Sequence, residues 1–170
     1  MINDVVKYFF RFVLLMLIQG LIIKNIDLGI FVNPFIYVLF ILILPFNMAK
    51  WLLLIIAFFS GLIADMFYDT IGIHAAACTF MGYCKPYVFN LFSPRGGYES
   101  SKEPSVRDYG ISWFLSVSTV LIVLHHFVLF YLEVFKISEF FYTFFRVVLS
   151  SVVSIFFVLL GQYTIYRNKE

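Results

Sequence analysis

The chain has 170 residues, of which 62% are hydrophobic, 21% aromatic and 13% charged, and its formal net charge is +2. A soluble domain carries about 25% charged residues, so this composition excludes a soluble globular protein and predicts an integral membrane protein. We expect no nucleic-acid partner, and in a membrane protein the placement of the charges is more informative than their total.

Six apolar stretches between polar breaks predict a single all-α domain, residues 1–170, with six transmembrane helices. The predicted spans are about 8–23, 31–44, 51–64, 71–91, 112–131 and 140–163. The second and third are short for a span, and Pro34 and Pro45 flank the second, so these two could be tilted, kinked or partly re-entrant. The first stretch has no cleavage site that leads into a polar region, so we expect a retained helix.

The basic residues outside the predicted spans are distributed unequally between the two sides of the membrane. With both termini in the cytoplasm, the cytoplasmic side holds Lys7, Arg11, Lys50, Arg95, Lys102, Arg107, Arg167 and Lys169. The outer side then holds only Lys24 and Lys136. This asymmetry follows the positive-inside rule and predicts a multi-pass protein of the cytoplasmic (inner) membrane with both termini inside.

One sizeable polar loop, residues 93–108, joins the fourth and fifth predicted spans. It is rich in Gly, Pro and Ser and carries charges of both signs, which predicts a flexible loop on the cytoplasmic side. Its bases could contact anionic lipid headgroups or a cytoplasmic partner. Alternatively, the loop is a solvated linker that helps to fix the topology.

Two carboxylates, Asp65 and Asp69, stand between the third and fourth predicted spans. Ala57, Gly61 and Asp65 share one helix face at a spacing of four residues, and small residues at this spacing allow close helix packing in lipid. Gly72 opens a second series of small residues in the following helix. We therefore expect a tight hairpin of these two helices, with both carboxylates at its outer tip.

Arg146 is predicted to lie about five residues inside the outer end of the last span. A buried arginine in lipid needs an anion, so we expect contact between Asp65 and Arg146. Asp69 precedes Thr70 and the start of the fourth helix, where a carboxylate can accept free backbone N–H groups as a cap. The hydroxyls of Ser112, Ser116, Thr119, Ser150 and Ser154 are expected to bind neighbouring helices by hydrogen bonds.

Three histidines, His74, His125 and His126, fall in the outer halves of their helices. A metal cluster of Asp65, Asp69, His74 and His126 is chemically conceivable, but its spacing is unspecific. The sequence contains no HExxH, GxSxG or P-loop motif. We therefore expect no catalytic site, metal or cofactor, and we interpret Cys78 and Cys84 as core thiols.

The stretch LPFNMAKWLLLIIAFFSGLIADMFYDTIGIHAAACTFMGY, residues 44–83, resembles the MreD family of bacterial rod shape-determining membrane proteins. The family pattern is an apolar helix that ends in Gly-Leu-x-x-Asp, a short gap, and a Gly-hydrophobe pair that opens a small-residue helix reaching a Tyr. Its elements are here Gly61, Leu62, Asp65, Gly72, Ile73 and Tyr83.

The resemblance implies a noncatalytic membrane scaffold of the cell-elongation complex, which supports cell shape and peptidoglycan synthesis. Its implied partners are an MreC-like bitopic protein, a RodA glycosyltransferase with its transpeptidase partner, MreB filaments and membrane lipid. It also implies a six-helix fold similar to the S components of energy-coupling-factor vitamin transporters. On this interpretation Gly61, Asp65, Asp69, Gly72 and Arg146 serve structure or partner contact.

Two other functions remain open at this point. If the likeness to S components extends to function, Asp65, His74, His126 and Arg146 form a pocket for a polar vitamin. A metal-dependent intramembrane hydrolase built on the same residues is the third hypothesis, and it predicts bound zinc.

Overall fold

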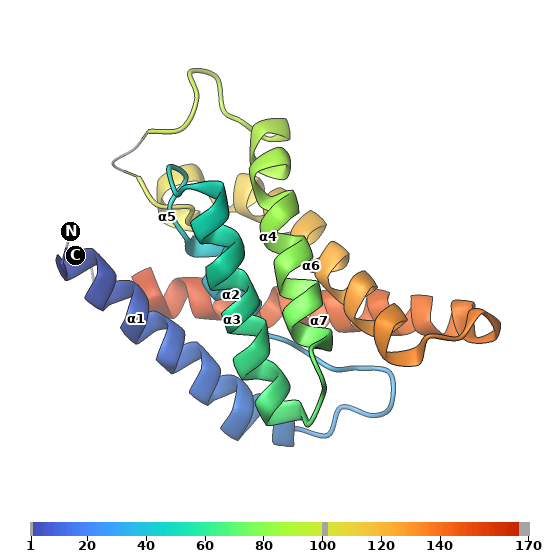
Figure 1. Cartoon of the computed structure of the whole chain (residues 1–170). Coiled ribbons are helices and arrows are strands. Elements are labelled where there is room, and N and C mark those ends of the chain that lie inside the picture. The colour runs from blue at the N-terminus through green and yellow to red at the C-terminus, as the bar shows by residue number, and fades with distance from the viewer. Residues whose placement is uncertain (1, 100–101, 167–170) are drawn as a thin grey trace.

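The structure is a computed structural model that describes residues 2–99 and 102–166. Over these residues it is a bundle of helices without β-strands (Figure 1). The long helices are α1 (Ile2–Leu17), α3 (Lys50–Tyr68), α4 (Ile73–Leu91), α6 (Ile111–Val134) and α7 (Phe140–Tyr166). The short elements are the π-helical turn η1 (Ile18–Ile22), the 3-10 turns η2 (Ile23–Asn25) and η3 (Ile137–Glu139), and the helices α2 (Val38–Ile43) and α5 (Val106–Tyr109).

Four helical stretches in the described part of the chain are long and apolar enough to cross a membrane. They cover residues 4–25, 50–68, 111–134 and 140–165, and they coincide with the first, third, fifth and sixth predicted spans. The protein is therefore an all-α membrane protein with several apolar helices. The fourth predicted span corresponds to α4, which has 19 residues but includes His74, Lys85 and Asn90.

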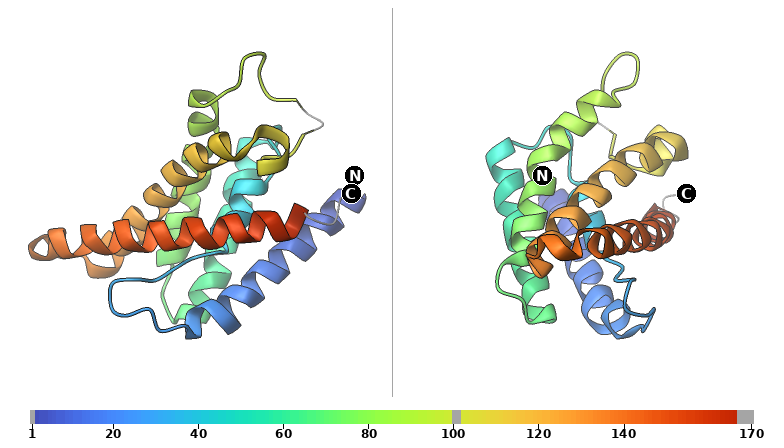
Figure 2. Two further views of the ribbon diagram at one scale, coloured as in Figure 1. Left: turned by 180° about the vertical axis from the view of Figure 1, so that it is seen from behind. Right: turned by 90° about the vertical axis from the view of Figure 1, so that its right-hand side faces the viewer.

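The chain ends and the connections gather at two opposite ends of the bundle (Figures 1 and 2). At one end, which we call the termini end, α1 starts, α7 finishes, and the connections 44–49 and 92–110 lie. At the other, the hairpin end, lie the connections 26–36, 69–72 and 135–139.

The predicted hairpin is present as α3 and α4, joined by a four-residue turn. Asp69 and Gly72 both have positive φ, of 55° and 80°, which turns the chain within these few residues. At Gly61 an added Cβ would lie 2.4 Å from the backbone oxygen of His74 and 2.5 Å from the Cα of Ala75. The two helix backbones therefore touch at Gly61, as the small-residue spacing predicts.

The second predicted span, residues 31–44, is not a membrane-spanning helix. Residues 26–36 run without regular helix, and only the six residues of α2 are helical before the chain turns at Leu44 and Pro45. Proline at position 34 lacks a backbone N–H, and proline disfavours helix in the residue before it, so the flanking Pro34 and Pro45 limit the helix to a short piece.

Residues 34–44, which we call the buried segment, occupy the centre of the bundle. Every one of them is buried, and Tyr37, Val38, Leu39, Ile41 and Ile43 have no exposed surface. Together with Leu15, Leu121 and Phe130 from the surrounding helices, the segment forms the main hydrophobic core. An apolar run in a membrane protein can thus be core rather than lipid-facing surface, and hydropathy alone does not separate the two.

The 93–108 loop is also different from the prediction, because much of it is fixed to the bundle. Tyr98 stacks on Phe46 with ring centroids 4.2 Å apart, and its hydroxyl donates to the Phe89 carbonyl at 2.7 Å. Burial raises the pKa of Tyr98, which keeps this hydroxyl protonated as a donor. Glu103 accepts hydrogen bonds from Lys7 and from Arg11 of α1. The loop therefore closes the termini end of the bundle instead of extending freely from it.

Candidate functional site

The polar groups inside the bundle surround the buried segment and the extended chain before it. Backbone N–H and C=O groups that lie outside a helix have no internal partners, and lipid supplies none. Side chains of η1, α4 and α7 bind the main chain of residues 31–44.

Gln19 provides the largest share of these hydrogen bonds. Its Oε1 accepts from the backbone N–H groups of Ile36, at 2.7 Å, and Tyr37, at 3.4 Å. Its Nε2 donates to the Pro34 carbonyl at 3.1 Å and to the Tyr68 hydroxyl. Gln19 is fully buried and lies in the π-helical turn η1. The local widening of the helix turn at η1 places this amide against the buried segment.

Two serines of α7 bind the same stretch of main chain. Ser154 Oγ accepts from the Phe35 N–H at 2.9 Å and lies 3.0 Å from Nε2 of His126. Ser150 Oγ accepts from the Asn33 N–H at 3.0 Å and donates to the Phe31 carbonyl at 3.2 Å. Ser154 therefore links α7 to α6 as predicted and also binds the non-helical main chain, whereas the printed partners of Ser150 are main-chain groups of residues 31 and 33.

Lys85 caps the other end of the buried segment. Its ammonium donates to the carbonyls of Ile41, at 2.9 Å, and Leu44, at 2.7 Å, at the C-terminus of α2. Its side chain is buried, and the charge lies 5.0 Å from the ring centre of Phe89. A cation at a helix C-terminus is favoured by the helix dipole and satisfies carbonyls that the helix leaves free.

Tyr37 is the polar centre of the segment itself. Its hydroxyl lies 2.9 Å from Nδ1 of His74 and 2.9 Å from Nε2 of His125, and 3.6 Å from Sγ of Cys78. All four side chains are buried, and Nδ1 of His125 has no hydrogen-bond partner. The hydroxyl thus links α4 to α6 through the buried segment.

Asp65 is buried at the end of α3 and caps the next helix. Its Oδ1 accepts from the His74 N–H at 2.9 Å and from the Thr70 hydroxyl, and its Oδ2 accepts from the Ala75 N–H at 3.0 Å. These amides are at the free N-terminus of α4, where a carboxylate is stabilised by hydrogen bonds and by the helix dipole. The capping role that the sequence assigned to Asp69 therefore belongs to Asp65.

Asp69 and Arg146 have other environments than predicted. Asp69 is exposed and ends α3 in the left-handed conformation, with its N–H bonded to the Asp65 carbonyl. Arg146 pairs with Glu133 of α6 at 3.0 Å and lies 4.2 Å from the ring centre of Phe130. The expected contact between Asp65 and Arg146 is therefore not formed. Asp65 binds the start of α4, and Arg146 pairs with Glu133.

Arg146 also holds the chain that leads into the buried segment. With the amide of Asn33 oriented so that its oxygen faces the guanidinium, that oxygen accepts from Arg146 at 3.1 and 3.2 Å. Arg146 therefore adds to the polar groups that fix the non-helical stretch.

The four residues of the alternative ligand pocket are divided by an aromatic side chain. Phe35 lies between His74 and His126, with ring centres 5.1 and 5.4 Å from its own. Asp65 lies against the backbone of His74 on one side, and Arg146 pairs with Glu133 on the other. In the described part of the chain, no group of three or more His, Cys, Asp and Glu side chains is arranged to hold a metal ion.

The residues that matter most here, Gln19, Tyr37 and Lys85, were not among the candidates from sequence. A signal for two of them was available, since an amide and an amine in the apolar runs 8–23 and 71–91 require buried partners. The prediction of a helix over residues 31–44 does not reveal those partners, because a helix satisfies its own backbone groups.

The chain was compared with known protein families, with curated proteins and with solved structures, and none of the three comparisons finds a match.

Proposed function

We propose that this protein is a noncatalytic scaffold subunit of a bacterial cell-elongation complex, of the MreD type, in the cytoplasmic membrane. Its partners on this proposal are an MreC-like bitopic chain and a RodA-like glycosyltransferase with its transpeptidase, linked to MreB filaments. The proposal rests on the resemblance of residues 44–83 and on how the polar side chains of the bundle are used.

The observation that carries the proposal is the engagement of the buried polar groups with main chain. Gln19, Ser150, Ser154 and Lys85 bind the main chain of residues 31–44, and Asp65 binds the start of α4. Groups that already satisfy backbone are poorly suited to bind a substrate, because their release leaves buried N–H and C=O groups without partners. A rigid bundle of this kind supports a role in holding other membrane chains.

The distribution of charge supports the proposed orientation. The termini end carries Lys7, Arg11, Lys50 and the bases of the 93–108 loop, whereas the hairpin end has Lys24 and Lys136. By the positive-inside rule the termini end faces the cytoplasm. That end would then be available to cytoplasmic filaments, and the α3–α4 and α6–α7 tips to periplasmic segments of partners.

Affinity purification from native membranes in mild detergent, followed by mass spectrometry, tests the proposal. We expect MreC-like and RodA-like chains, and their recovery should fall for Asp65→Ala but not for Asp69→Asn, a substitution at an exposed position. Recovery of ATPase subunits with a bound vitamin would instead support an S component. About one zinc per chain would support the hydrolase.

A further inference from the structure

Two adjacent histidines of α6, His125 and His126, reach the buried segment at two different residues. Nε2 of His126 lies 3.0 Å from Oγ of Ser154, which accepts the N–H of Phe35. Nε2 of His125 lies 2.9 Å from the hydroxyl of Tyr37. Both histidines are fully buried. Which ring nitrogen carries the proton is therefore decided by the other partners of each ring and hydroxyl.

The second ring nitrogen of His126 determines its protonation. Nδ1 lies 2.8 Å from the carbonyl oxygen of Ile122, which can only accept a hydrogen bond, so Nδ1 carries a proton. Ser154 Oγ already accepts from the Phe35 N–H, and its own hydrogen needs an acceptor. Nε2 of a neutral His126 supplies that acceptor. Main-chain N–H, hydroxyl, imidazole and carbonyl thus form one chain in which every hydrogen bond runs in the same direction.

The hydroxyl of Tyr37 can be satisfied in two ways, because it donates one hydrogen bond and accepts another. If it donates to Nε2 of His125, the proton of that ring is on Nδ1, which is buried and has no hydrogen-bond partner among the described residues. If it donates instead to Nδ1 of His74, at 2.9 Å, it accepts from His125 Nε2–H and leaves only a lone pair on the unpartnered nitrogen. Buried N–H groups without an acceptor are rarer in proteins than acceptors without a donor, which favours the second arrangement.

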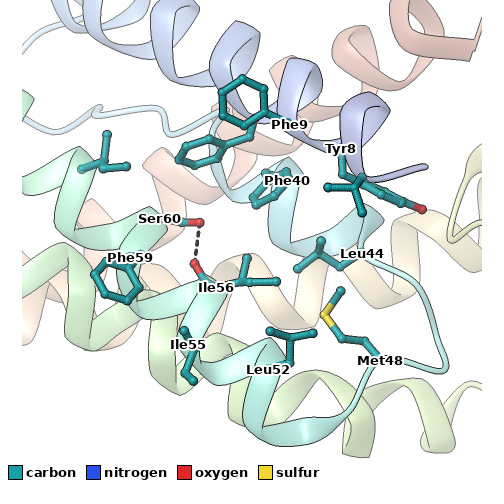
Figure 3. Close-up of a pocket in the computed structure, with 13 residues that line it drawn as sticks. Tyr8, Phe9, Phe40, Leu44, Met48, Leu52, Ile55, Ile56, Phe59 and Ser60 are labelled. Atoms are coloured by element: carbon teal, nitrogen blue, oxygen red, sulfur yellow. Dashed lines mark hydrogen bonds between the residues drawn. The ribbon is translucent and has the colours of Figure 1, made fainter. Parts of the chain in front are cut away.

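The other half of the buried segment is less completely enclosed by protein. Phe40 and Leu44, in and directly after α2, border an apolar groove of about 470 Å³ between α1 and α3 (Figure 3). Apolar packing is non-directional, and here it is interrupted on one side. The hydrogen bonds at residues 35 and 37 therefore contribute to the position of the segment in a way that packing does not.

We propose that His125 and His126 clamp the buried segment as neutral imidazoles in opposite tautomers. His126 carries its proton on Nδ1 and accepts from Ser154, whereas His125 carries its proton on Nε2 and donates to Tyr37. Two successive residues of one helix thereby hold the main chain at Phe35 and the side chain at Tyr37. The inference is independent of the proposed scaffold role, since it concerns proton positions inside the bundle.

NMR spectroscopy of the wild-type protein in detergent at neutral pH, labelled with nitrogen-15 and carbon-13, tests the tautomers directly. A protonated ring nitrogen and one with a free lone pair differ in their nitrogen-15 chemical shifts, and the two rings are assigned through the backbone without any variant. We expect a protonated Nδ1 in His126 and a protonated Nε2 in His125. The same tautomer in both rings, or a doubly protonated ring at either position, would overturn the proposal.

Hydrogen exchange at the Phe35 amide distinguishes a clamp from a space-filling role. His126→Leu keeps a buried apolar side chain but removes the acceptor that orients the Ser154 hydroxyl, so this amide should exchange about tenfold faster. His126→Gln keeps a neutral acceptor and should retain the protection. Val123→Leu, at an exposed position on the same helix, is the matched control and should leave exchange unchanged. Equal exchange in His126→Leu and the wild type would overturn the clamp.

Discussion

The carboxylate of Asp65, at the end of α3, accepts the backbone N–H groups of His74 and Ala75 at the start of α4. One side chain therefore fixes the geometry of the α3–α4 hairpin. The close backbone contact at Gly61 acts on the same part of α4, since an added Cβ there would meet His74 and Ala75. Cap and contact together give Gly61 and Asp65 each a structural role.

Replacement of Asp65 should destabilise the protein in proportion to the lost acceptors. Asp65→Ala removes both carboxylate oxygens and should lower the free energy of unfolding by roughly 2 to 4 kcal/mol. Asp65→Asn keeps one acceptor oxygen and should give an intermediate loss. Thermal unfolding in detergent, followed by the fluorescence of the two tryptophans, measures this. Equal stability of the wild type and Asp65→Ala would contradict the capping role.

Gly61→Ala should separate α3 from α4. The new Cβ would lie 2.4 to 2.6 Å from backbone atoms of His74 and Ala75, which cannot move aside by changing rotamer. The expected loss is about 3 kcal/mol or more, at the upper end of the cost of overpacking. Leu62→Ala, at a neighbouring exposed position, serves as the control in the same unfolding assay. A Gly61→Ala variant as stable as Leu62→Ala would show that the helices do not touch there.

Lys85→Met should destabilise the end of the buried segment although it removes a charge from an apolar region. Methionine has a similar length but cannot donate to the carbonyls of Ile41 and Leu44. Two buried acceptors left without donors should cost roughly 2 to 5 kcal/mol. Lys50→Met, at an exposed position, is the matched control. A Lys85→Met variant that unfolds at a higher temperature than the wild type would show that these capping hydrogen bonds do not stabilise the fold.

Glu103→Gln should release the 93–108 loop from α1. The carboxylate accepts from Lys7 and Arg11, and a neutral amide cannot hold both bases. Trypsin should then cleave faster at Arg95, Lys102 and Arg107. Glu99→Gln, which breaks only the exposed pair with Lys102, should leave cleavage unchanged, and the same rate in both variants would contradict a closed loop.

Much of the helical framework could be predicted from sequence, because α1, α3, α6 and α7 are long apolar runs with polar breaks. The close contact at Gly61 was also predictable, since a small residue four positions before a buried carboxylate indicates close packing. Both depend on local composition and spacing. The prediction of Asp69 as the cap was wrong. The left-handed turn at Asp69, and not distance along the chain, determines which carboxylate reaches the N–H groups of α4.

The buried segment and its partners could not be predicted in the same way. Residues 34–44 are as apolar as a lipid-facing helix, and only their packing shows that they are core. The hydrogen bonds that hold them come from residues 15 to 119 positions away, as for Gln19 with Pro34 and Ser154 with Phe35. The order of the 93–108 loop likewise depends on distant groups, among them Phe46 and Lys7.

Depletion of the protein in its native cells, with cell length and width measured by microscopy, tests the scaffold role most directly. We expect depleted cells to lose rod shape and to recover it with the wild-type chain. A folded His126→Gln variant should also restore shape, because the contacts of that imidazole, with Ser154 and with the Ile122 carbonyl, are structural. Unchanged shape after depletion, with loss of uptake of a small molecule instead, would contradict the proposed function.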